Sequence, residues 1–141
     1  MRRTITALAL LFFVPFVSYA QQENSTAPPA VEPIVPAVID LSPAEVAAML
    51  GQPNVFIYDC NEADMHAEAR VPGAKLTVYD EVTAAILPAD RSAMLVFYCY
   101  SPECPAGAMA AQTALTLGYA NVFCMSAGIL GWQDAGLGTE P

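Results

Sequence analysis

The chain has 141 residues, of which 55% are hydrophobic and only 13% are charged, and its formal net charge is −9. The chain has only five Lys and Arg residues against fourteen Asp and Glu residues. It therefore lacks the clustered cations with which proteins bind nucleic acids and anionic membrane surfaces. Disorder is also excluded, because disordered chains combine low hydrophobicity with high charge. The composition predicts one small acidic domain, in which four cysteines need an explanation.

Residues 1–20 have the layout of a secretory signal peptide. A cationic start, Met1-Arg2-Arg3, precedes an apolar run, and Ser18-Tyr19-Ala20 supplies the small residues of a cleavage site. The apolar run is shorter than the roughly 20 residues that span a bilayer, so we expect cleavage after Ala20 and no stable membrane insertion. Export would place the protein in the periplasm or outside the cell, where disulfides persist. The mature chain would keep three basic and fourteen acidic residues, a formal charge of −11.

Residues 21–39 are rich in proline and show neither helical nor strand periodicity. Such a segment favours extended, semi-rigid backbone, and we interpret it as a tether to a domain formed by residues 40–141. The alternative is a segment that packs along the domain surface, because Ile34, Val35 and Val38 are apolar.

The rest of the chain alternates apolar runs, typical of buried strands, with segments typical of helices. The expected elements, in chain order, are a helix from the capping box Ser42-Pro43-Ala44-Glu45 to about Leu50, a strand over 55–58, a helix or loop over 61–69, a short strand over 75–79, one or two helical turns in 80–87, a strand over 94–99, an Ala-rich helix over 106–117, a strand over 121–125 and a short helix over 127–136. This alternation predicts an α/β fold with a small, mostly parallel sheet and helices on both faces.

Three of the four cysteines follow or end predicted strands, where open parallel sheets bind their ligands. Cys99 is the best placed, because it ends the strongest strand and a short loop leads from it into a helix. The loop consists of Tyr100, Ser101, Pro102, Glu103, Cys104 and Pro105, and Ala106 begins the helix. If the loop curls back, its N–H groups and the helix N-terminus would favour a Cys99 thiolate, which is the nucleophilic form.

The order and spacing of several short motifs resemble the rhodanese-like domains. The motifs are Ile57-Tyr58-Asp59, Arg70-Val71-Pro72-Gly73-Ala74, Val96-Phe97-Tyr98-Cys99, Leu117-Gly118-Tyr119-Ala120-Asn121-Val122 and Gly128-Ile129-Leu130-Gly131-Trp132. The resemblance implies that Cys99 accepts a sulfane sulfur from a small donor, carries it as a persulfide and passes it to a thiol acceptor. It also implies a supporting ion pair between Asp59 and Arg70, because the matching family positions lie near each other.

The sequence departs from the family pattern in its charges. Asn61 stands where the family commonly has Arg, and Arg70 stands where His is usual. The loop after Cys99 carries no Lys or Arg, and Glu103 adds a negative charge. We therefore predict poor activity with thiosulfate, a dianion. The related phosphatase loop, Cys-x5-Arg, is excluded because its last position is occupied by Pro105.

Cys104 supports a hypothesis from a different class. Five residues from Cys99, it could close a disulfide or resolve a persulfide on Cys99, as in an exported thiol–disulfide protein that works with a redox partner protein. A third alternative is a rhodanese-like module that binds a partner without catalysis.

The other candidates are expected to be structural. Free cysteines are usually buried, so we interpret Cys60 and Cys124 as core residues, while a disulfide between them stays open. A zinc site made of all four cysteines is disfavoured, because no close Cys-x2-Cys pair exists. His66 is predicted to lie at the surface. No metal or cofactor is expected.

Overall fold

The structure of the chain, a computed structural model, describes residues 37–141. Within this range the chain forms β1 (Ile39–Asp40), α1 (Pro43–Met49), β2 (Val55–Asp59), α2 (Ala63–Glu68), β3 (Lys75–Leu76), β4 (Met94–Tyr98), α3 (Ala106–Thr116), β5 (Asn121–Met125) and α4 (Gly128–Asp134). The predicted signal peptide and residues 21–36 of the predicted tether lie outside the described residues.

The five strands form one sheet in the order β1-β5-β4-β2-β3, and every neighbouring pair is parallel. The register of the three central strands aligns Asp59 of β2 with Tyr98 of β4, and Tyr98 with Met125 of β5. The carboxyl ends of these strands therefore reach the same edge of the sheet. This is the edge at which the sequence predicted that the cysteines following the strands would lie.

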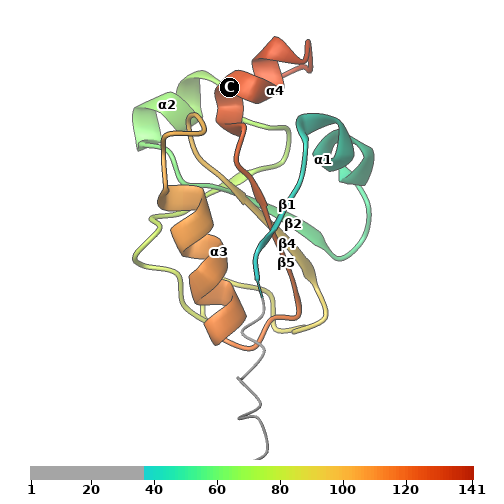
Figure 1. The fold of residues 1–141 in the computed structure, drawn as a ribbon, viewed down its shortest axis with the longest axis vertical. Coiled ribbons are helices and arrows are strands. Elements are labelled where there is room, and N and C mark those ends of the chain that lie inside the picture. The colour runs from blue at the N-terminus through green and yellow to red at the C-terminus, as the bar shows by residue number, and fades with distance from the viewer. Residues whose placement is uncertain (1–36) are drawn as a thin grey trace, which may run out of the picture. The chain divides into compact units, whose positions relative to one another are not determined.

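Helices cover both faces of the sheet (Figure 1), which confirms the predicted fold class. The apolar side of α3, with Ala110, Ala111 and Ala114, packs with Leu95 and Phe97 on one face. On the other face lie the only buried side chain of α1, Val46, and two from α4, Ile129 and Trp132. Alternate residues of β4 enter the two clusters, since successive side chains of a strand point to opposite faces. The site at the end of β4 therefore rests on core packing on both sides.

The capping box that begins α1 is confirmed. The Glu45 N–H donates to Ser42 Oγ (3.3 Å), and the Ser42 N–H donates back to Glu45 Oε2 (2.8 Å). These bonds supply partners for N–H groups that the first turn of a helix leaves unpaired.

Three predicted elements differ from the structure. Ile39, placed in the tether, belongs to β1, because it pairs with Phe123 of β5. The strand predicted over 75–79 ends at Leu76. Residues 80–87 form no helix, and a single turn bond from the Ile86 N–H to the Thr83 carbonyl (3.2 Å) replaces the expected helical turns. No helix among residues 37–141 is long and apolar enough to cross a membrane.

Candidate active site

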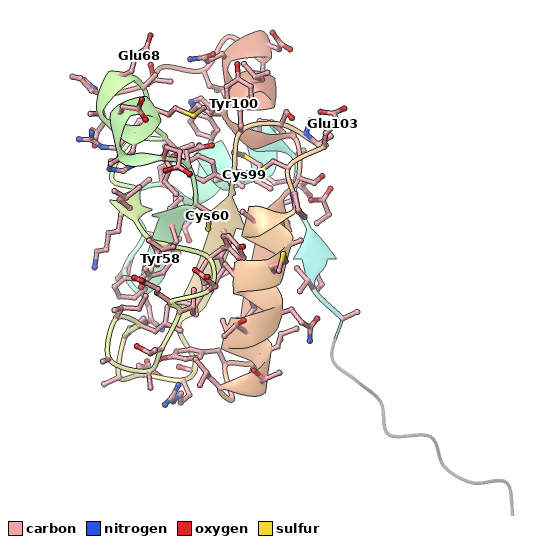
Figure 2. The ribbon with its side chains drawn as sticks, turned by 90° about the vertical axis from the view of Figure 1, so that its left-hand side faces the viewer. Tyr58, Cys60, Glu68, Cys99, Tyr100 and Glu103 are labelled. Atoms are coloured by element: carbon pink, nitrogen blue, oxygen red, sulfur yellow. A yellow bond between two sulfur atoms is a disulfide. The ribbon has the colours of Figure 1, made fainter. Side chains whose placement is uncertain are left out.

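Cys99 follows the last residue of β4 and is joined by a disulfide to Cys104 on the loop that leads to α3. The two Cα atoms lie 6.1 Å apart, within the usual range for a disulfide. The Cys104 N–H donates to the Ser101 carbonyl (3.0 Å), so the loop makes one tight turn. Figure 2 shows this loop at the end of the sheet, with Cys99 close to Cys60 and with Tyr58 further from the loop. The pairing that the sequence left open is thus present in the structure.

Gly107 lets the first turn of α3 press against the backbone at the end of β4. A Cβ atom at this position would lie 3.0 Å from the carbonyl carbon of Tyr98 and 3.3 Å from the Cys99 nitrogen. Any larger residue would have to move the helix away from the strand that ends at Cys99. Sequence reasoning did not single out Gly107, since a glycine inside a helix carries no distinctive local pattern.

The N-terminal end of α4 holds the other side of the loop. The Ile129 N–H donates to the Cys99 carbonyl (2.9 Å), and the Leu130 N–H donates to the Tyr100 carbonyl (3.1 Å). Gly128 makes this approach possible, because its φ of +67° is left-handed and a Cβ would collide with the backbone of Tyr100 and Ser101. The path of the loop is therefore fixed by backbone contacts to α4 as well as by the disulfide.

A cavity of about 570 Å³ opens directly over the disulfide. All three cysteines at this end of the sheet, Cys60, Cys99 and Cys104, contribute to its wall. The rest of the lining is mainly apolar: Met65, Tyr79, Tyr100, Pro105, Ala106 and Met109, with Asn61 and Glu62 as the polar members. A cavity of this size, with a few polar groups in an apolar wall, has the character of a small-molecule site.

The polar surroundings of the Cys99 sulfur differ from those expected of a curled loop. The hydrogen bonds within residues 37–141 include none from a loop N–H to Cys99 Sγ. The sulfur instead lies 3.7 Å from Asn61 Oδ1 and 3.9 Å from the Cys60 carbonyl oxygen. Pro102 and Pro105 have no N–H to offer, and the Cys104 N–H is engaged within the loop. Backbone stabilisation of a thiolate is thus not built into this oxidised loop.

Asn61 carries an unpartnered nitrogen beside this sulfur. Its Nδ2 is buried and, among the described residues, has no hydrogen-bond partner. The two ends of a side-chain amide are assigned from their surroundings, and a half-turn of the amide exchanges them. Such a turn would direct the Nδ2 donor toward Cys99 Sγ, so Asn61 can donate a hydrogen bond to a thiolate or persulfide at this position.

The predicted ion pair between Asp59 and Arg70 is wrong. Asp59 is fully buried and its Oδ2 interacts instead with His66 Nδ1 (2.9 Å) and accepts from the Tyr98 hydroxyl (2.7 Å). Arg70 pairs with Glu140 near the C-terminus (Nε to Oε1, 3.3 Å). The reason is the short helix α2, which turns the His66 ring back to the end of β2.

The expected surface position of His66 is wrong for the same reason. Its side chain is only 15% exposed, because the ring packs toward the buried Asp59 carboxyl group. Below it, the Tyr98 hydroxyl accepts from the Val71 N–H (3.1 Å) while donating to Asp59. This network ties β2, β4 and α2 together through Tyr98, the residue that precedes Cys99. Burial, with the nearby Asp59 as the next cause, raises the pKa of Tyr98 well above its usual value, so this hydroxyl stays a donor.

Cys60 and Cys124 are buried and unpaired, as expected for core cysteines. Burial raises the pKa of Cys60 to about 12 and that of Cys124 to about 11, with smaller contributions from Asp59 and Asp40 respectively. Both therefore remain thiols at neutral pH and are poor nucleophiles. Although Cys60 lines the cavity, its thiol stays protonated, so Cys99 and Cys104 are the candidates for a reactive sulfur among the cysteines of the cavity wall.

The remaining loop residues divide between the cavity wall and the outer side of the loop. Tyr100 lines the cavity and is 42% exposed, while Ala106 is buried at the start of α3. Ser101 Oγ donates to Glu103 Oε2 (2.7 Å), which lowers the pKa of the Glu103 carboxyl group. Figure 2 shows Glu103 on the outer side of the loop. The negative charge expected in the loop is therefore present, but it does not belong to the cavity wall.

The fold and the site together define a parallel α/β domain with a cysteine at the carboxyl end of its central strand. The family profile of the rhodanese-like domain matches residues 42–135. The chain belongs to the rhodanese-like domain family. A comparison with curated protein sequences gave no match.

Solved structures agree with this assignment. A thiosulfate sulfurtransferase from Pseudomonas aeruginosa is 26% identical, with a TM-score of 0.64, and the alignment covers 75% of this chain but 20% of that one. SseA from Escherichia coli, a 3-mercaptopyruvate sulfotransferase, is 17% identical (TM-score 0.61; 74% and 50% covered). A protein of unknown function from Rhodopseudomonas palustris, described as a possible tyrosine phosphatase, is 24% identical (TM-score 0.60; 73% and 85% covered). The chain thus shares a fold with sulfurtransferases of greater length.

Proposed function

We propose that this protein transfers sulfane sulfur through a persulfide on Cys99. The observation that carries the proposal is the position of Cys99 at the end of the central strand, open to a cavity and bonded to a second sulfur atom. Membership of a family that includes sulfurtransferases, and the likeness to two such enzymes, support the same reaction. The partners proposed are a small sulfur donor and a thiol acceptor.

The reaction has two steps. The Cys99 thiolate attacks the outer sulfur of the donor, a sulfur–sulfur bond forms at Cys99, and the donor leaves with the electron pair of its broken bond. A thiolate acceptor then attacks the outer sulfur, takes it and returns the Cys99 thiolate. Asn61 is the group we assign to hydrogen-bond the negatively charged sulfur in both steps, because its unpartnered amide nitrogen lies beside Cys99.

The disulfide favours a second candidate function, thiol–disulfide exchange. Cys104 can attack the inner sulfur of a Cys99 persulfide, which releases hydrosulfide and forms the Cys99–Cys104 bond seen in the structure. A dithiol partner protein would then reduce this bond and become a disulfide itself. The same pair without a sulfane donor would act as a redox carrier. A phosphatase reaction lacks support, because Pro105 occupies the position of the phosphate-binding Arg.

Mass spectrometry of the reduced full chain after addition of a sulfane donor tests the proposal. Wild type and Cys104→Ser are expected to gain the mass of one sulfur atom, located on Cys99 by peptide mapping. Cys99→Ser is the matched control and is expected to gain nothing. A Cys99→Ser variant that keeps full biological activity would contradict both chemical functions and favour a non-catalytic binding role.

We propose further that the protein works in the periplasm or outside the cell. The layout of residues 1–20 supports this location, and a disulfide is compatible with an oxidising compartment. N-terminal sequencing of the protein from a bacterial host is expected to give Gln21 as the first residue. An intact Met1 in the soluble fraction of the cytoplasm would contradict it.

A further inference from the structure

The wall of the cavity over the disulfide is unusual in how little charge it carries. Its large side chains are those of Met65 in α2, Met109 in α3, Tyr79 and Tyr100. Three of these, Tyr79, Tyr100 and Met109, are large hydrophobic residues that remain 37–49% exposed. Flexible methionine and aromatic side chains bind apolar groups of varied shape. The occupant of the cavity should therefore be apolar around its reacting sulfur atoms.

None of the basic side chains in residues 37–141 lines the cavity. Each of the three Lys and Arg residues has another partner: Arg70 pairs with Glu140, Lys75 lies over the Phe56 ring (5.2 Å) and Arg91 over the Tyr119 ring (4.4 Å). His66, the single histidine, faces the buried Asp59. A negatively charged ligand would consequently lose its hydration without gaining a cationic partner.

Glu62 supplies the one formal charge of the cavity wall. It lies at the N-cap of α2, is exposed, and its carboxylate makes no hydrogen bond or ion pair with another described residue. A positive group on a ligand could approach this carboxylate while the rest of the molecule contacts the methionine and tyrosine side chains. The cavity is thus complementary in charge to a cation.

We propose that the cavity selects a small organic molecule with a sulfur–sulfur bond, apolar around the sulfur atoms and positively charged at its periphery. The proposal rests on the proposed function in one respect, namely that Cys99 is the reacting sulfur. It goes further by naming the chemical class that the site accepts. The cavity volume, about 570 Å³, suits a molecule of this kind, since small-molecule sites span about 300–1,000 Å³.

The preference of the cavity for one ligand over another can be measured by the oxidation of the reduced Cys99–Cys104 pair with a small symmetric disulfide. The Cys99 thiolate attacks one sulfur of the probe, forms a mixed disulfide and expels one probe thiolate. The Cys104 thiolate then attacks Cys99 Sγ, closes the intramolecular disulfide and expels the second thiolate. One probe disulfide is reduced to two thiols, and one protein dithiol is oxidised to a disulfide.

Three probes of similar size separate charge from reactivity: cystamine is positively charged, 2-hydroxyethyl disulfide is neutral and dithiodiglycolate is negatively charged. Each rate constant with the reduced full chain is divided by the rate constant of the same probe with 2-mercaptoethanol. This normalisation removes the intrinsic reactivity of the probe. We expect the order cystamine, hydroxyethyl disulfide, dithiodiglycolate, with about tenfold or more between first and last at low ionic strength.

Two variants test the assignment to this cavity. Glu62→Gln is expected to lower the normalised cystamine rate about two- to fivefold relative to the rate of the neutral probe. Asp134→Asn is the matched control, because it removes the same charge from an exposed position that does not line the cavity. Met109→Lys is expected to raise the dithiodiglycolate rate about three- to tenfold, whereas the neutral Met109→Gln is not.

The outcomes separate the two proposals. If no probe releases thiol, Cys99 is not a reactive sulfur and the proposed function fails. If all three probes react but their normalised rates agree within about twofold, or the anionic probe is fastest, Cys99 is reactive but the selection inferred from the cavity is wrong. A preference for cystamine that Asp134→Asn weakens as much as Glu62→Gln does would also overturn it, since the effect would then come from the overall charge.

Discussion

Asn61 combines a buried, unpartnered amide nitrogen with an oxygen 3.7 Å from the Cys99 sulfur. A buried donor without a partner destabilises the fold by about 1–3 kcal/mol, so its position beside the Cys99 sulfur supports the proposed role of Asn61 as a donor to a thiolate or persulfide. The family commonly has Arg at this position, and Asn retains a donor without a charge. Asn61 therefore fits a site that handles ligands lacking negative charge.

Replacing Asn61 by Leu should separate stability from reactivity. Leu keeps the branched shape but removes the donor, so alkylation of reduced Cys99 by iodoacetamide is expected to slow about tenfold at pH 7, with its pH midpoint shifted upward. The free energy of unfolding should stay unchanged or increase, because the orphaned nitrogen is gone.

The background for this measurement is Cys104→Ser, and Asn61→Asp is the companion variant. Asp places a negative charge beside the sulfur and should slow alkylation more than Leu does. Equal alkylation rates in all three proteins would show that Asn61 does not contact the reactive sulfur.

Backbone contacts from a neighbouring element, together with the disulfide, fix the path of the loop. The backbone of α4 donates two hydrogen bonds to the carbonyls of Cys99 and Tyr100, which requires Gly128 to be in van der Waals contact with the loop. The effect of a side chain at this point can be isolated, because Gly136 has almost the same φ angle and lies in open space. Its φ is +72°, against +67° for Gly128, and a Cβ atom at Gly136 would have no neighbour within 4 Å.

Gly128→Ala is expected to destabilise the protein more than Gly136→Ala does. Both substitutions force alanine into a left-handed conformation, which costs about 1–3 kcal/mol, but only the first also collides with the loop. Denaturant unfolding gives the difference, and the rate of thiol release from 2-hydroxyethyl disulfide should fall in Gly128→Ala alone. Indistinguishable unfolding curves for the two variants would argue that α4 does not brace the loop.

A further prediction concerns the face of the sheet that holds Tyr58, Cys60 and Cys124. Burial raises the pKa of Tyr58 and of Cys60 to about 12, above their usual values near 10 and 9. Between pH 9 and 12 the unfolded chain loses these protons first, so stability is full below pH 9 and falls as the pH rises. Each group contributes a slope of up to about 1.4 kcal/mol per pH unit.

Thermal unfolding between pH 8 and 11 measures this slope. The Cys99→Ser/Cys104→Ser background is needed, because a Cys60 thiolate would otherwise attack the disulfide. Cys60→Ala in that background should flatten the decline of Tm with pH, whatever its effect on Tm at pH 8. If the two curves remain parallel, the Cys60 thiol already ionises in the folded protein at moderate pH.

Elements with a long pattern in the sequence could be predicted, and elements with a short pattern could not. The capping box of α1, the apolar runs of β2, β4 and β5 and the Ala-rich α3 all have patterns longer than a single turn or pair, and all were found. By contrast β1 has two residues, and it exists because Ile39 pairs with Phe123, 84 positions away. Only the assembled sheet creates that partner.

Some features of the candidate site could likewise be predicted from the sequence, and others could not. The position of Cys99 follows from strand order, since the carboxyl ends of parallel strands share an edge. The partner of Asp59 does not, because it depends on how a six-residue helix turns His66 toward the sheet rather than on spacing. The cavity wall combines side chains from α2, α3 and three loops, and no local motif marks such a set.

At the scale of the whole molecule, the charge balance bears on which of the proposed sulfur donors can approach the cavity. The formal charge of the chain is −9, and the cavity wall carries a carboxylate and no cation. Thiosulfate, a dianion, is therefore repelled during approach and unassisted when bound, so thiosulfate:cyanide sulfurtransferase activity should be weak. Repulsion between like charges is screened by salt, since the Debye length falls from about 30 Å at 0.01 M to about 8 Å at 0.15 M.

The activity with thiosulfate should consequently rise with ionic strength. We expect kcat/KM to increase about two- to fivefold between 0.01 and 0.15 M potassium chloride, which is the reverse of the behaviour of a site that attracts its donor through cations. Met109→Lys should raise the activity at low salt and remove part of this salt dependence, because the added ammonium group lies in the cavity wall. Met109→Gln is the control for the loss of the methionine itself. A kcat/KM that falls with salt, or that equals the rate of efficient sulfurtransferases at low salt, would show that a cationic group outside this cavity guides the donor.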